Sequence, residues 1–493
     1  MAWQPFEKTE NCYDVVIVGA GISGINFAYR LQERLPHLSY IILEGRHEIG
    51  GTWSLFKYPG LRSDSDLYTF GFSWRPWTER TSIARGELIK DYVEESARKY
   101  NIDKKIKFNH RVSNANYSSS ENSWTLNVQA KGESFNVKAR FLSLCTGYYD
   151  YEMPLQTTIP GIDSFCGKVV HPQFWPEDLD YTDKDIVVIG SGATAVTILP
   201  VLAEKASQVT MVQRSPGYVI SALTEDATEK FVRRWFSWWP AFQHWVIRTK
   251  YILMSLFFMN ILARYPEKAK EGILKRIAAS LPETVPIDPH FTPRYFPGQQ
   301  RMCLSPNGDF YDAFKSGKAT VETGEIETVT KDAIKLASGK TLHPDIIITA
   351  TGLKLIFASG IKFQVDNAIV DVSKQFVWRG VMIEGLPNAA TAMGYSNASW
   401  TLGADASAQL VCRIIKQMRR DGVVRVTPKM TETERSTMKP GPSRMTSTYL
   451  KLGGGAMPKP GNSGPWLPRS HYIKDIWTAW YGNIYTNLEW EKA

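Results

Sequence analysis

Apolar and glycine-rich stretches alternate near the start of the chain in a pattern that predicts one strand–helix–strand unit. Residues 14–18 (DVVIV) form a β-branched run. The following stretch, GAGISGINFAYRLQERLP, passes from glycines into a helix-period pattern that ends at Pro36, and Tyr40–Leu43 is a second apolar run. A strand, a glycine turn, a helix and a strand in this order are typical of a βαβ unit of a parallel sheet.

The same pattern returns in the middle of the chain. Asp185–Ile189 is a short apolar run, GSGATAVTILPVLAEKA leads from it into a helix, and Gln208–Val212 is the next strand. Because each such unit can hold one nucleotide, two units imply two nucleotide sites. We therefore expect an α/β protein with two Rossmann-like dinucleotide-binding domains.

Three further stretches complete the predicted organisation. Short alternating segments in 106–144 predict an antiparallel meander that covers the first sheet. Residues 231–264 carry a helix-period apolar stripe, broken once at Pro240, within a helical insertion at about 221–295 of the second nucleotide unit. The tail after about residue 430 is rich in Pro, Gly, Ser and Thr and is predicted to be mostly loop.

The apolar stripe has two interpretations. A stripe of this period usually faces a core, so a core or substrate-tunnel helix pair is favoured. The alternative is a weak, reversible contact with an anionic membrane, with basic side chains near the lipid head groups: Arg233, Arg234, Arg248, Lys250 and Arg264. The longest apolar run, Tyr251–Ala263, has 13 residues and is too short for a span of about 20 residues.

Composition narrows the class of protein. Of 493 residues, 43% are hydrophobic and 22% are charged, which excludes a disordered or fibrous chain. The net charge of +9, spread over this length, is a weak sign of an anionic partner; neither a nucleic acid nor an obligate protein partner is predicted. Five scattered cysteines without a C-x-x-C favour a cytoplasmic protein with no metal site, and the N-terminus, MAWQPFEKTENCYD, does not resemble a secretory signal.

The first glycine motif predicts an FAD-type site. It comprises Gly19, Gly21 and Gly24, and Glu44 stands at the end of the following strand. Gly19 allows the tight turn, Gly21 lets the backbone approach a pyrophosphate, and Gly24 lets the helix pack on the strand. Glu44 is placed to accept hydrogen bonds from a ribose diol, so a dinucleotide rather than a mononucleotide is predicted.

The second motif differs at the position that selects the nucleotide. It runs through Gly190, Ser191, Gly192, Ala193, Thr194 and Ala195. No acid ends its second strand; Arg214 and Ser215 stand there instead. A guanidinium can pair with a 2′-phosphate, so NADPH is favoured over NADH, although a solvated surface arginine is the alternative.

A further motif lies between the two units. Phe165, Gly167, His171, Trp175 and Pro176 match F-x-G-x-x-x-H-x-x-x-W-P, and in this respect the chain resembles the type I Baeyer–Villiger monooxygenases. Segments such as GGTWSLFKYPGLRSDSDLYTFGFSWRPW (50–77), QRMCLSPNGDF (300–310) and GYSNASWTL (394–402) are similar to the ethionamide-activating branch of that family. The resemblance covers most of residues 12–415. Taken alone, His171 is more typical of a hydrogen-bonded structural histidine than of an acid–base catalyst, and within the resemblance it is interpreted as a hinge or domain-linking residue.

The resemblance implies a domain plan and a chemistry. It implies an FAD-binding domain at 1–150 and 350–493 and an NADP-binding domain at 151–349. It also implies a C4a-peroxyflavin, formed from reduced FAD and O2, that inserts oxygen into apolar ketones or transfers it to sulfides. A flavin-containing N- or S-monooxygenase and an electron-transfer flavoprotein reductase remain as alternatives.

The resemblance also implies roles for single residues. The family's catalytic arginine falls on Arg301 and its partner aspartate on Asp64, although Asp64 in the sequence SDSD could instead be a helix N-cap or a loop carboxylate. Where many members of the family carry a lysine, this chain has Gln300, which leaves more of the 2′-phosphate contact to Arg214. The implied FAD contacts are Ser23, Glu44, Thr52, Trp53, Asp64 and Val112; the implied NADP contacts are Arg62, Ser63, Ser191, Thr194, Arg214 and Ser215.

Overall fold

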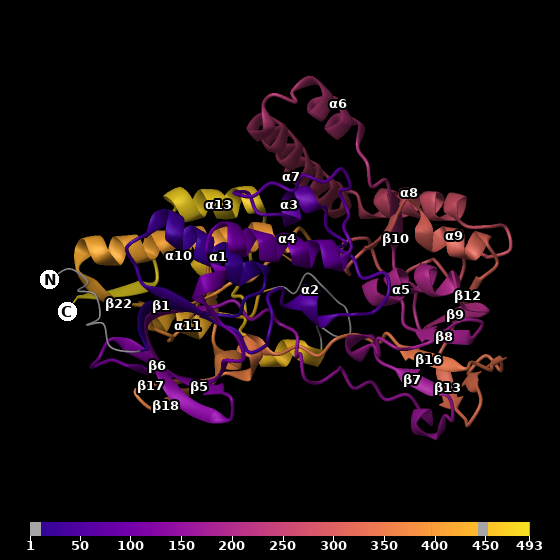
Figure 1. The fold of residues 1–493 in the computed structure, drawn as a ribbon, viewed down its shortest axis with the longest axis horizontal. Coiled ribbons are helices and arrows are strands. Elements are labelled where there is room, and N and C mark those ends of the chain that lie inside the picture. Colours follow the sequence, from indigo (N-terminus) through magenta and orange to yellow (C-terminus); the bar gives the residue numbers. More distant parts are fainter. Residues whose placement is uncertain (1–10, 396, 442–451, 493) are drawn as a thin grey trace.

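Two open sheets lie next to each other in the computed structural model, which describes residues 11–395, 397–441 and 452–492 (Figure 1). The α/β fold class predicted from the two glycine motifs is confirmed. The expectation about a secretory signal rests on the first residues of the chain, and residues 1–10 lie outside the described part, as do 442–451 of the tail.

The larger sheet has nine strands in the order β18-β17-β4-β5-β6-β1-β2-β3, with β21 also paired to β6. β1, β2 and β6 are mutually parallel around the first glycine turn. The strands are β1 (Cys12–Val18), β2 (Tyr40–Leu43), β3 (Ile106–Lys107), β4 (Arg111–Ser118), β5 (Ser123–Ala130), β6 (Glu133–Leu144), β17 (Lys362–Val365), β18 (Ala368–Val370) and β21 (Ala389–Thr391).

β1 is apolar along its whole length because both faces of the sheet are covered. Val15 and Ile17 belong to the core under the helices, whereas Val16 and Val18 belong to a separate core on the opposite face. Near-continuous apolar runs are typical of strands buried on both sides. The expected meander does form in β4, β5 and β6, but it extends the first sheet through the parallel β1–β6 pairing; the prediction that it covers that sheet was wrong.

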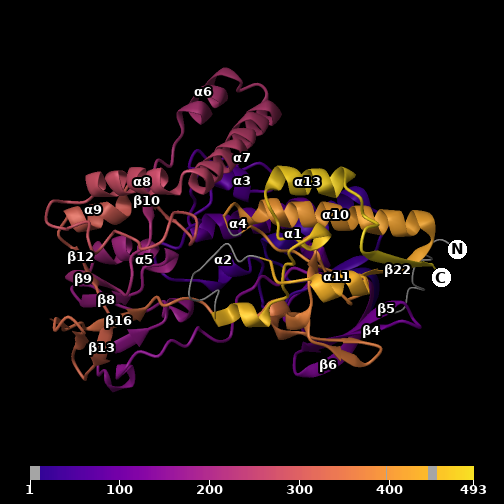
Figure 2. The same cartoon turned by 180° about the vertical axis from the view of Figure 1, so that it is seen from behind.

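One face of the larger sheet is covered by helices from distant parts of the chain. α1 (Ile22–Arg34) packs against α10 (Trp400–Asp421), and α13 (Tyr472–Tyr481) packs on α10 (Figures 1 and 2). Arg30 of α1 forms a buried ion pair with Asp405 of α10, with Nε at 2.7 Å from the carboxylate. The tail is therefore more ordered than its composition predicts, since it also supplies α11 (Glu432–Thr437) and β23 (Leu488–Lys492), which pairs with β22 (Val423–Pro428).

The second sheet is smaller and entirely parallel, in the order β12-β9-β8-β16-β7. As in β1, successive side chains of β8 belong to two different cores: Ile186 and Val188 belong to one core, and Val187 and Ile189 to the other. The elements are β7 (Lys168–Val170), β8 (Asp185–Ile189), α5 (Ala193–Ala203), β9 (Gln208–Gln213), α9 (Asp309–Lys315), β12 (Ala319–Thr323) and β16 (Ile346–Thr349).

Smaller elements join these layers. Two-stranded or three-stranded sheets are formed by β10 (Val219–Ala222) with β11 (Cys303–Pro306), by β13 (Ile326–Val329), β14 (Ile334–Leu336) and β15 (Thr341–Leu342), and by β19 (Val377–Trp378) with β20 (Met382–Ile383). The remaining helices are α2 (Thr52–Leu55), α3 (Leu67–Phe70), α4 (Gly86–Lys99), α6 (Ala227–Trp235), α7 (Pro240–Arg264) and α8 (Pro266–Ser280).

Two chain segments that run between the sheets pair with each other. The N–H of Asp150 donates to the carbonyl of Lys354 at 2.9 Å, and Tyr149 and Leu355 form an antiparallel bridge. An ion pair between Lys354 Nζ and Asp150 at 2.9 Å reinforces the pairing. This double crossing lies near the predicted domain boundaries at 150 and 350, which stay a prediction.

α6 and the first half of α7 stand away from the body in both views (Figures 1 and 2). Pro240 begins α7, so the predicted break of the stripe is confirmed. The preferred interpretation of the stripe as a core helix pair was wrong for most of its aromatic positions, because Trp235, Trp238 and Trp245 are 62%, 73% and 62% exposed. The 13-residue apolar run also lies within a helix of 25 residues, which is long and apolar enough to cross a membrane by length and composition.

Candidate functional site

A cavity of about 1680 Å³ lies where the two sheets meet, at the carboxyl ends of β1 and β8. Both glycine turns line it, since Gly19 follows β1 and Gly190 follows β8. Ligands of open α/β sheets bind at this edge of the strands. Pockets for a single small molecule measure about 300–1,000 Å³, so the volume suits more than one ligand at once.

The three glycines of the first turn are needed for different reasons. Gly19 has a φ of +103°, which side chains other than hydrogen rarely allow. A Cβ on Gly24 would lie 1.9 Å from the Gly19 carbonyl oxygen, so Gly24 sets the closeness of α1 and β1. A Cβ on Gly21 would meet only Gly51, at 3.6 Å, so the protein's own packing does not demand glycine there. Gly21 borders the cavity, and the close approach of a bound phosphate to the backbone would explain the need for glycine at this position.

Glu44 ties the end of β2 to the same turn. Its carboxylate accepts hydrogen bonds from the backbone N–H of Ala20 at 2.6 Å and of Arg46 at 2.9 Å. Burial raises the pKa of Glu44, and these two N–H groups and the Arg46 charge offset part of that increase. The carboxylate is thus fixed at the cavity wall with further acceptor capacity.

The glycines of the second turn also differ in whether the protein's own packing requires them. Gly190 has a φ of +136°, and a Cβ there would lie 2.3 Å from the Ala350 carbonyl oxygen. A Cβ on Gly192 would meet nothing within 4 Å. Gly21 and Gly192 are the N-caps of α1 and α5, and neither helix carries an acid in its first turn. The positive ends of both helix dipoles are therefore available to an anion.

The predicted 2′-phosphate contacts lie at the mouth of this second turn. Arg214 and Ser215 are exposed and line the cavity. The Ser191 hydroxyl donates to the Ser215 carbonyl at 2.8 Å, which holds the Arg214–Ser215 segment against the glycine turn.

The segment 62–66 carries three polar residues with separate contacts. Arg62 forms an ion pair with Asp309 and donates to the Leu304 carbonyl at 3.3 Å, so it joins this segment to β11 and to the start of α9. The alternative that Asp64 caps a helix was wrong: the N-cap of α3 is Asp66, whose side chain accepts from the N–H of Thr69 at 2.8 Å. Asp64 is thereby left to face the cavity.

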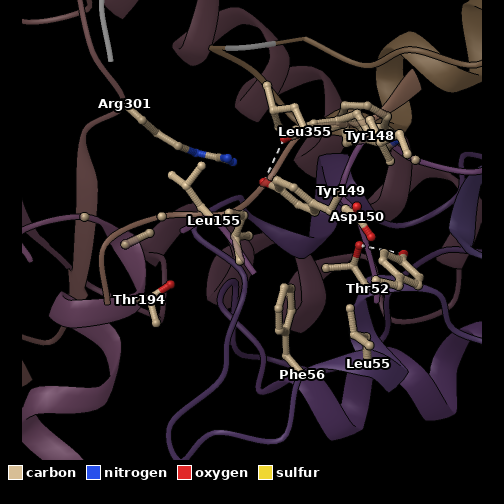
Figure 3. Close-up of a pocket in the computed structure, with 18 of the residues that line it drawn as sticks. Thr52, Leu55, Phe56, Tyr148, Tyr149, Asp150, Leu155, Thr194, Arg301 and Leu355 are labelled. Atoms are coloured by element: carbon tan, nitrogen blue, oxygen red, sulfur yellow. Dashed lines mark hydrogen bonds between the residues drawn. The ribbon is translucent and has the colours of Figure 1, made fainter. Parts of the chain in front are cut away.

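Asp64 and Arg301 interact across the cavity. Burial raises the pKa of the Asp64 carboxyl, and the positive charges of Arg301 and Arg62 offset part of the increase. Arg301 is on the loop before β11 and extends into the cavity toward Leu155 and Tyr149 (Figure 3). The structure therefore brings the two predicted catalytic residues to one site from positions far apart in sequence.

The apolar wall of the cavity is a feature that the sequence analysis missed. It includes Leu155 and Leu355, which lie near the end of Arg301 in Figure 3, and Leu55 and Phe56, which lie farther from Arg301, beyond Tyr149. The sequence did contain a signal, because GYYDYEMP directly follows β6, whose carboxyl end lies beside that of β1. The described part of the tail also contributes Met457, Pro458, Lys459 and Pro460.

Aromatic and hydroxyl groups connect this wall to the first turn. Tyr148 stacks on Trp400 with ring centroids 5.1 Å apart, and Trp400 Nε1 donates to the Ser23 hydroxyl at 2.8 Å. Thr52 lies 3.4 Å from the Tyr151 hydroxyl, and burial raises the pKa of Tyr151 to about 12. The Tyr151 phenol is thus a neutral donor at physiological pH.

The motif of Phe165, Gly167, His171, Trp175 and Pro176 lies outside the cavity. Gln173 donates to the Asp150 carbonyl at 2.7 Å, and the N–H of Gln173 donates to His171 Nδ1 at 3.2 Å. Burial lowers the pKa of His171, and the Gly352 backbone offsets part of the decrease. The motif therefore contacts both segments of the double crossing, in keeping with the predicted linking role, which stays a prediction.

Most predicted site residues meet in this one cavity. Those that line it are Gly19, Gly21, Ser23, Glu44, Thr52, Trp53, Arg62, Ser63, Asp64, Val112, Gly190, Ser191, Gly192, Ala193, Thr194, Arg214, Ser215 and Arg301. Those that do not are Gly24, Ala195, Phe165, Gly167, His171, Trp175 and Pro176.

The residues present fit two dinucleotides. Gly21 and Gly192 leave room for pyrophosphates beside two helix N-termini, Glu44 suits a ribose diol, and Arg214 suits a 2′-phosphate. Within the described ranges, no group of three or more His, Cys, Asp or Glu side chains is placed to hold a metal ion.

Known proteins with similar sequences cover almost the whole chain. Residues 13–232 match the model of the flavin-binding monooxygenase-like family. The chain is 44% identical over 467 residues to "FAD-containing monooxygenase EthA" of Mycobacterium tuberculosis, with 94% of each chain covered. It is 40% identical over 470 residues to "Probable FAD-binding monooxygenase AlmA" of Acinetobacter baylyi, with 94% of this chain and 93% of the relative covered.

A solved structure shares the fold at low sequence identity. "Oxidized steroid monooxygenase bound to NADP" superposes with a TM-score of 0.76 and 21% identity, over 98% of this chain and 100% of the other. The two-sheet architecture thus occurs in a protein whose sequence has diverged widely from this one.

Proposed function

The chain belongs to the flavin-binding monooxygenase-like family, and from this membership we propose that it is an FAD- and NADPH-dependent monooxygenase of Baeyer–Villiger type. We propose that it inserts one oxygen atom into small apolar ketones, giving esters or lactones, and oxidises sulfides to sulfoxides. The named relatives are described as FAD-containing or FAD-binding monooxygenases, and a structural neighbour binds NADP.

One observation carries the proposal: a single cavity contains both glycine turns, the Arg301–Asp64 pair and an apolar wall. Two nucleotide sites with neither a cation nor an apolar surface between them would suit an electron-transfer reductase equally well. A permanent positive charge beside apolar side chains instead suits a neutral organic substrate on which negative charge develops.

Each element has a defined role in this proposal. When bound, FAD supplies oxygen activation and NADPH supplies the two electrons that activation needs. The first turn and Glu44 hold FAD, whereas the second turn and Arg214 hold NADPH. Arg301 stabilises the oxyanion that develops on the substrate carbonyl, and Asp64 positions the guanidinium.

The apolar wall selects the substrate and keeps water out. Leu155, Leu355 and Phe56 offer no hydrogen-bonding groups, so they favour a hydrocarbon chain or ring beside the carbonyl (Figure 3). In the overall reaction one oxygen atom of O2 enters between the carbonyl carbon and its neighbour. The other leaves as water, with the electrons of NADPH and one proton from solvent.

Product identification with ¹⁸O2 separates this proposal from its alternatives. The purified enzyme is incubated with NADPH and a panel of linear ketones, cyclic ketones and aryl sulfides, and the products are analysed by gas chromatography with mass detection. We expect esters or lactones that carry one ¹⁸O atom. Sulfoxides without esters would identify a flavin-containing monooxygenase of the N- or S-oxidising kind, and NADPH consumption without any ¹⁸O in products would identify an electron-transfer reductase.

The substrate and O2 are the only partners that this function requires. A cytoplasmic location stays a prediction from cysteine usage.

A further inference from the structure

The exposed arm formed by α6, the turn after it and α7 (residues 227–264) has an unusual surface. Rings of the arm stack in sequence, with centroid distances of 5.7 Å for Trp238–Trp239, 5.0 Å for Trp239–Phe242 and 6.1 Å for Phe242–Trp245. The Trp238 side chain is the most exposed of these, at 73%. Large aromatic side chains gathered on the outside of a protein mark a surface that contacts something apolar.

The charge of the arm is predominantly basic. Residues 227–264 contain six Lys or Arg side chains and one acid, Glu229, which pairs with Arg233. Lys230 pairs with Glu225, just before the arm. Lys230 and Arg234 lie on α6, each directly before an exposed ring, Phe231 and Trp235 respectively. Indole rings next to basic side chains are typical of segments that lie in the interface of an anionic bilayer, where rings enter the head-group region and cations meet lipid phosphates.

The arm is held at its base, which determines how it can contact a membrane. Arg248 is buried and donates to the carbonyls of Tyr68 at 2.7 Å and Gly71 at 2.9 Å. Tyr251 packs on Tyr68 with ring centroids 5.1 Å apart, and Lys250 pairs with Asp226 at the start of α6. Although α7 is long enough to cross a bilayer, these contacts fix its middle against the body, so a peripheral contact is the geometry that preserves the fold.

The exposed apolar side of the arm continues toward the cavity. Leu253 and Phe257 extend it along α7, and Met259 and Leu262 near the end of α7 approach Gly298, three residues before Arg301. At 1.5 Å per residue, the tip near Trp239 lies about 30 Å along the helix axis from this point. One helix therefore connects the aromatic tip with the loop that carries Arg301.

From these observations we propose that the arm docks the enzyme on an anionic lipid surface. The exposed rings of Trp238, Trp239 and Trp245 enter the interface, and Lys230 and Arg234 contact lipid phosphates. This inference does not depend on the proposed reaction, because it rests on the surface of the arm alone.

Vesicle binding by the holoenzyme tests the proposal. The full chain is sedimented at low salt with vesicles of phosphatidylcholine alone and with vesicles of phosphatidylcholine mixed with phosphatidylglycerol, and tryptophan emission is followed. We expect binding to the anionic vesicles that weakens as salt rises, with a blue shift of emission. Absence of binding to anionic vesicles at low salt would overturn the proposal.

Matched variants identify the surface. The triple variant Trp238→Ser, Trp239→Ser, Trp245→Ser should weaken vesicle binding about tenfold or more, and Lys230→Gln with Arg234→Gln should remove most of its salt dependence. The control is Trp477→Ser, because Trp477 of α13 is also exposed, at 58%, but lies outside the arm. Unchanged binding by the triple variant, or equal loss by the control, would refute the assignment to the arm.

Two further measurements keep the outcome clear. Retained FAD and an unchanged melting temperature show that a variant is folded. Sedimentation velocity over a range of concentrations tests whether a second copy of the chain covers the arm instead. The arm would be assigned to a protein interface if the unmodified enzyme self-associated without binding vesicles and the triple variant abolished that self-association.

Discussion

Asp64 and Arg301 face one cavity from segments 237 positions apart, and the Arg301 guanidinium partly offsets the increase that burial imposes on the pKa of the Asp64 carboxyl. The carboxyl is thus desolvated, and its ionised form is favoured by the positive charges of Arg301 and Arg62. In the proposed function, Asp64 positions the Arg301 guanidinium, which stabilises the negative charge that develops on the substrate carbonyl.

Replacement of Arg301 by Ala should abolish oxygen insertion and leave reduction of the flavin by NADPH. Loss of one preorganised charge-stabilising group typically costs about 10²–10³-fold in rate, and hydride transfer develops no charge at this position. Stopped-flow absorbance follows reduction, and gas chromatography follows ester formation. Arg294→Ala, an exposed arginine on the same loop that does not line the cavity, is the matched control. Ester formation by Arg301→Ala at near the original rate would contradict the proposed role.

Replacement of Asp64 by Asn should stabilise the fold at neutral pH while it slows oxygen insertion. The folded pKa of Asp64 lies above its ordinary value of 3.8, so ionisation above that pH costs folded-state stability that Asn does not lose. The gain should appear as pH rises above about 3.9 and persist at pH 7, as a melting temperature higher by about 1–3 °C. Thermal melts across pH measure it, with exposed Asp178→Asn as the control. A melting temperature that falls at pH 7 would show that charge pairing outweighs desolvation.

Replacement of Arg214 by Ala should raise the KM for NADPH far more than the KM for NADH. One charge-assisted contact to a 2′-phosphate is worth about 1.5–3 kcal/mol, or about ten- to hundredfold in affinity. Steady-state kinetics with both nucleotides measure the ratio, and Arg276→Ala on α8, which lies outside the cavity, should leave it unchanged. Equal use of NADPH and NADH by the unmodified enzyme would refute the assignment of Arg214.

Two glycines of the first turn should fail in different ways when replaced by Ala. Gly21→Ala leaves the packing intact and should fold, but should bind FAD about ten- to hundredfold more weakly because the methyl group occupies the phosphate site. Gly24→Ala places a Cβ 1.9 Å from a carbonyl oxygen and should lose soluble protein. FAD content after gel filtration and soluble yield separate these effects. Gly272→Ala, in an open position on α8, should change neither; FAD retention by Gly21→Ala would contradict the assigned phosphate site.

Both nucleotide turns could be predicted from the sequence because their determinants are local. β1 and β8 are apolar without alternation, since each is buried on both faces, and each is followed by glycines whose backbone conformation is required within the turn itself. Glu44 and Arg214 each follow the second strand of their own βαβ unit. The distance of each from its glycine turn is therefore set by one helix and one strand. The assigned ligand contacts of these residues stay predictions.

The tertiary structure decided what depends on contacts between distant segments. The meander joined the larger sheet because β6 pairs with β1. The sequence could not indicate this, since the pairing of two strands is not encoded within either of them. The cavity wall of Leu155 and Leu355 exists because two crossing segments about 200 positions apart pair with each other, which no local pattern indicates.

The arm shows the same limit most clearly. Helix period determined that α6 and α7 form and that Pro240 divides them. It could not determine which side of the helices is covered, because an apolar stripe against a core and an apolar stripe left outside have the same spacing in sequence. The tertiary structure packs Arg248 and Tyr251 on the body and leaves Trp238 and Trp245 outside, so this stripe is a surface. Only the tertiary structure could decide this, because the burial of a helix face depends on the partners that the rest of the fold brings to it.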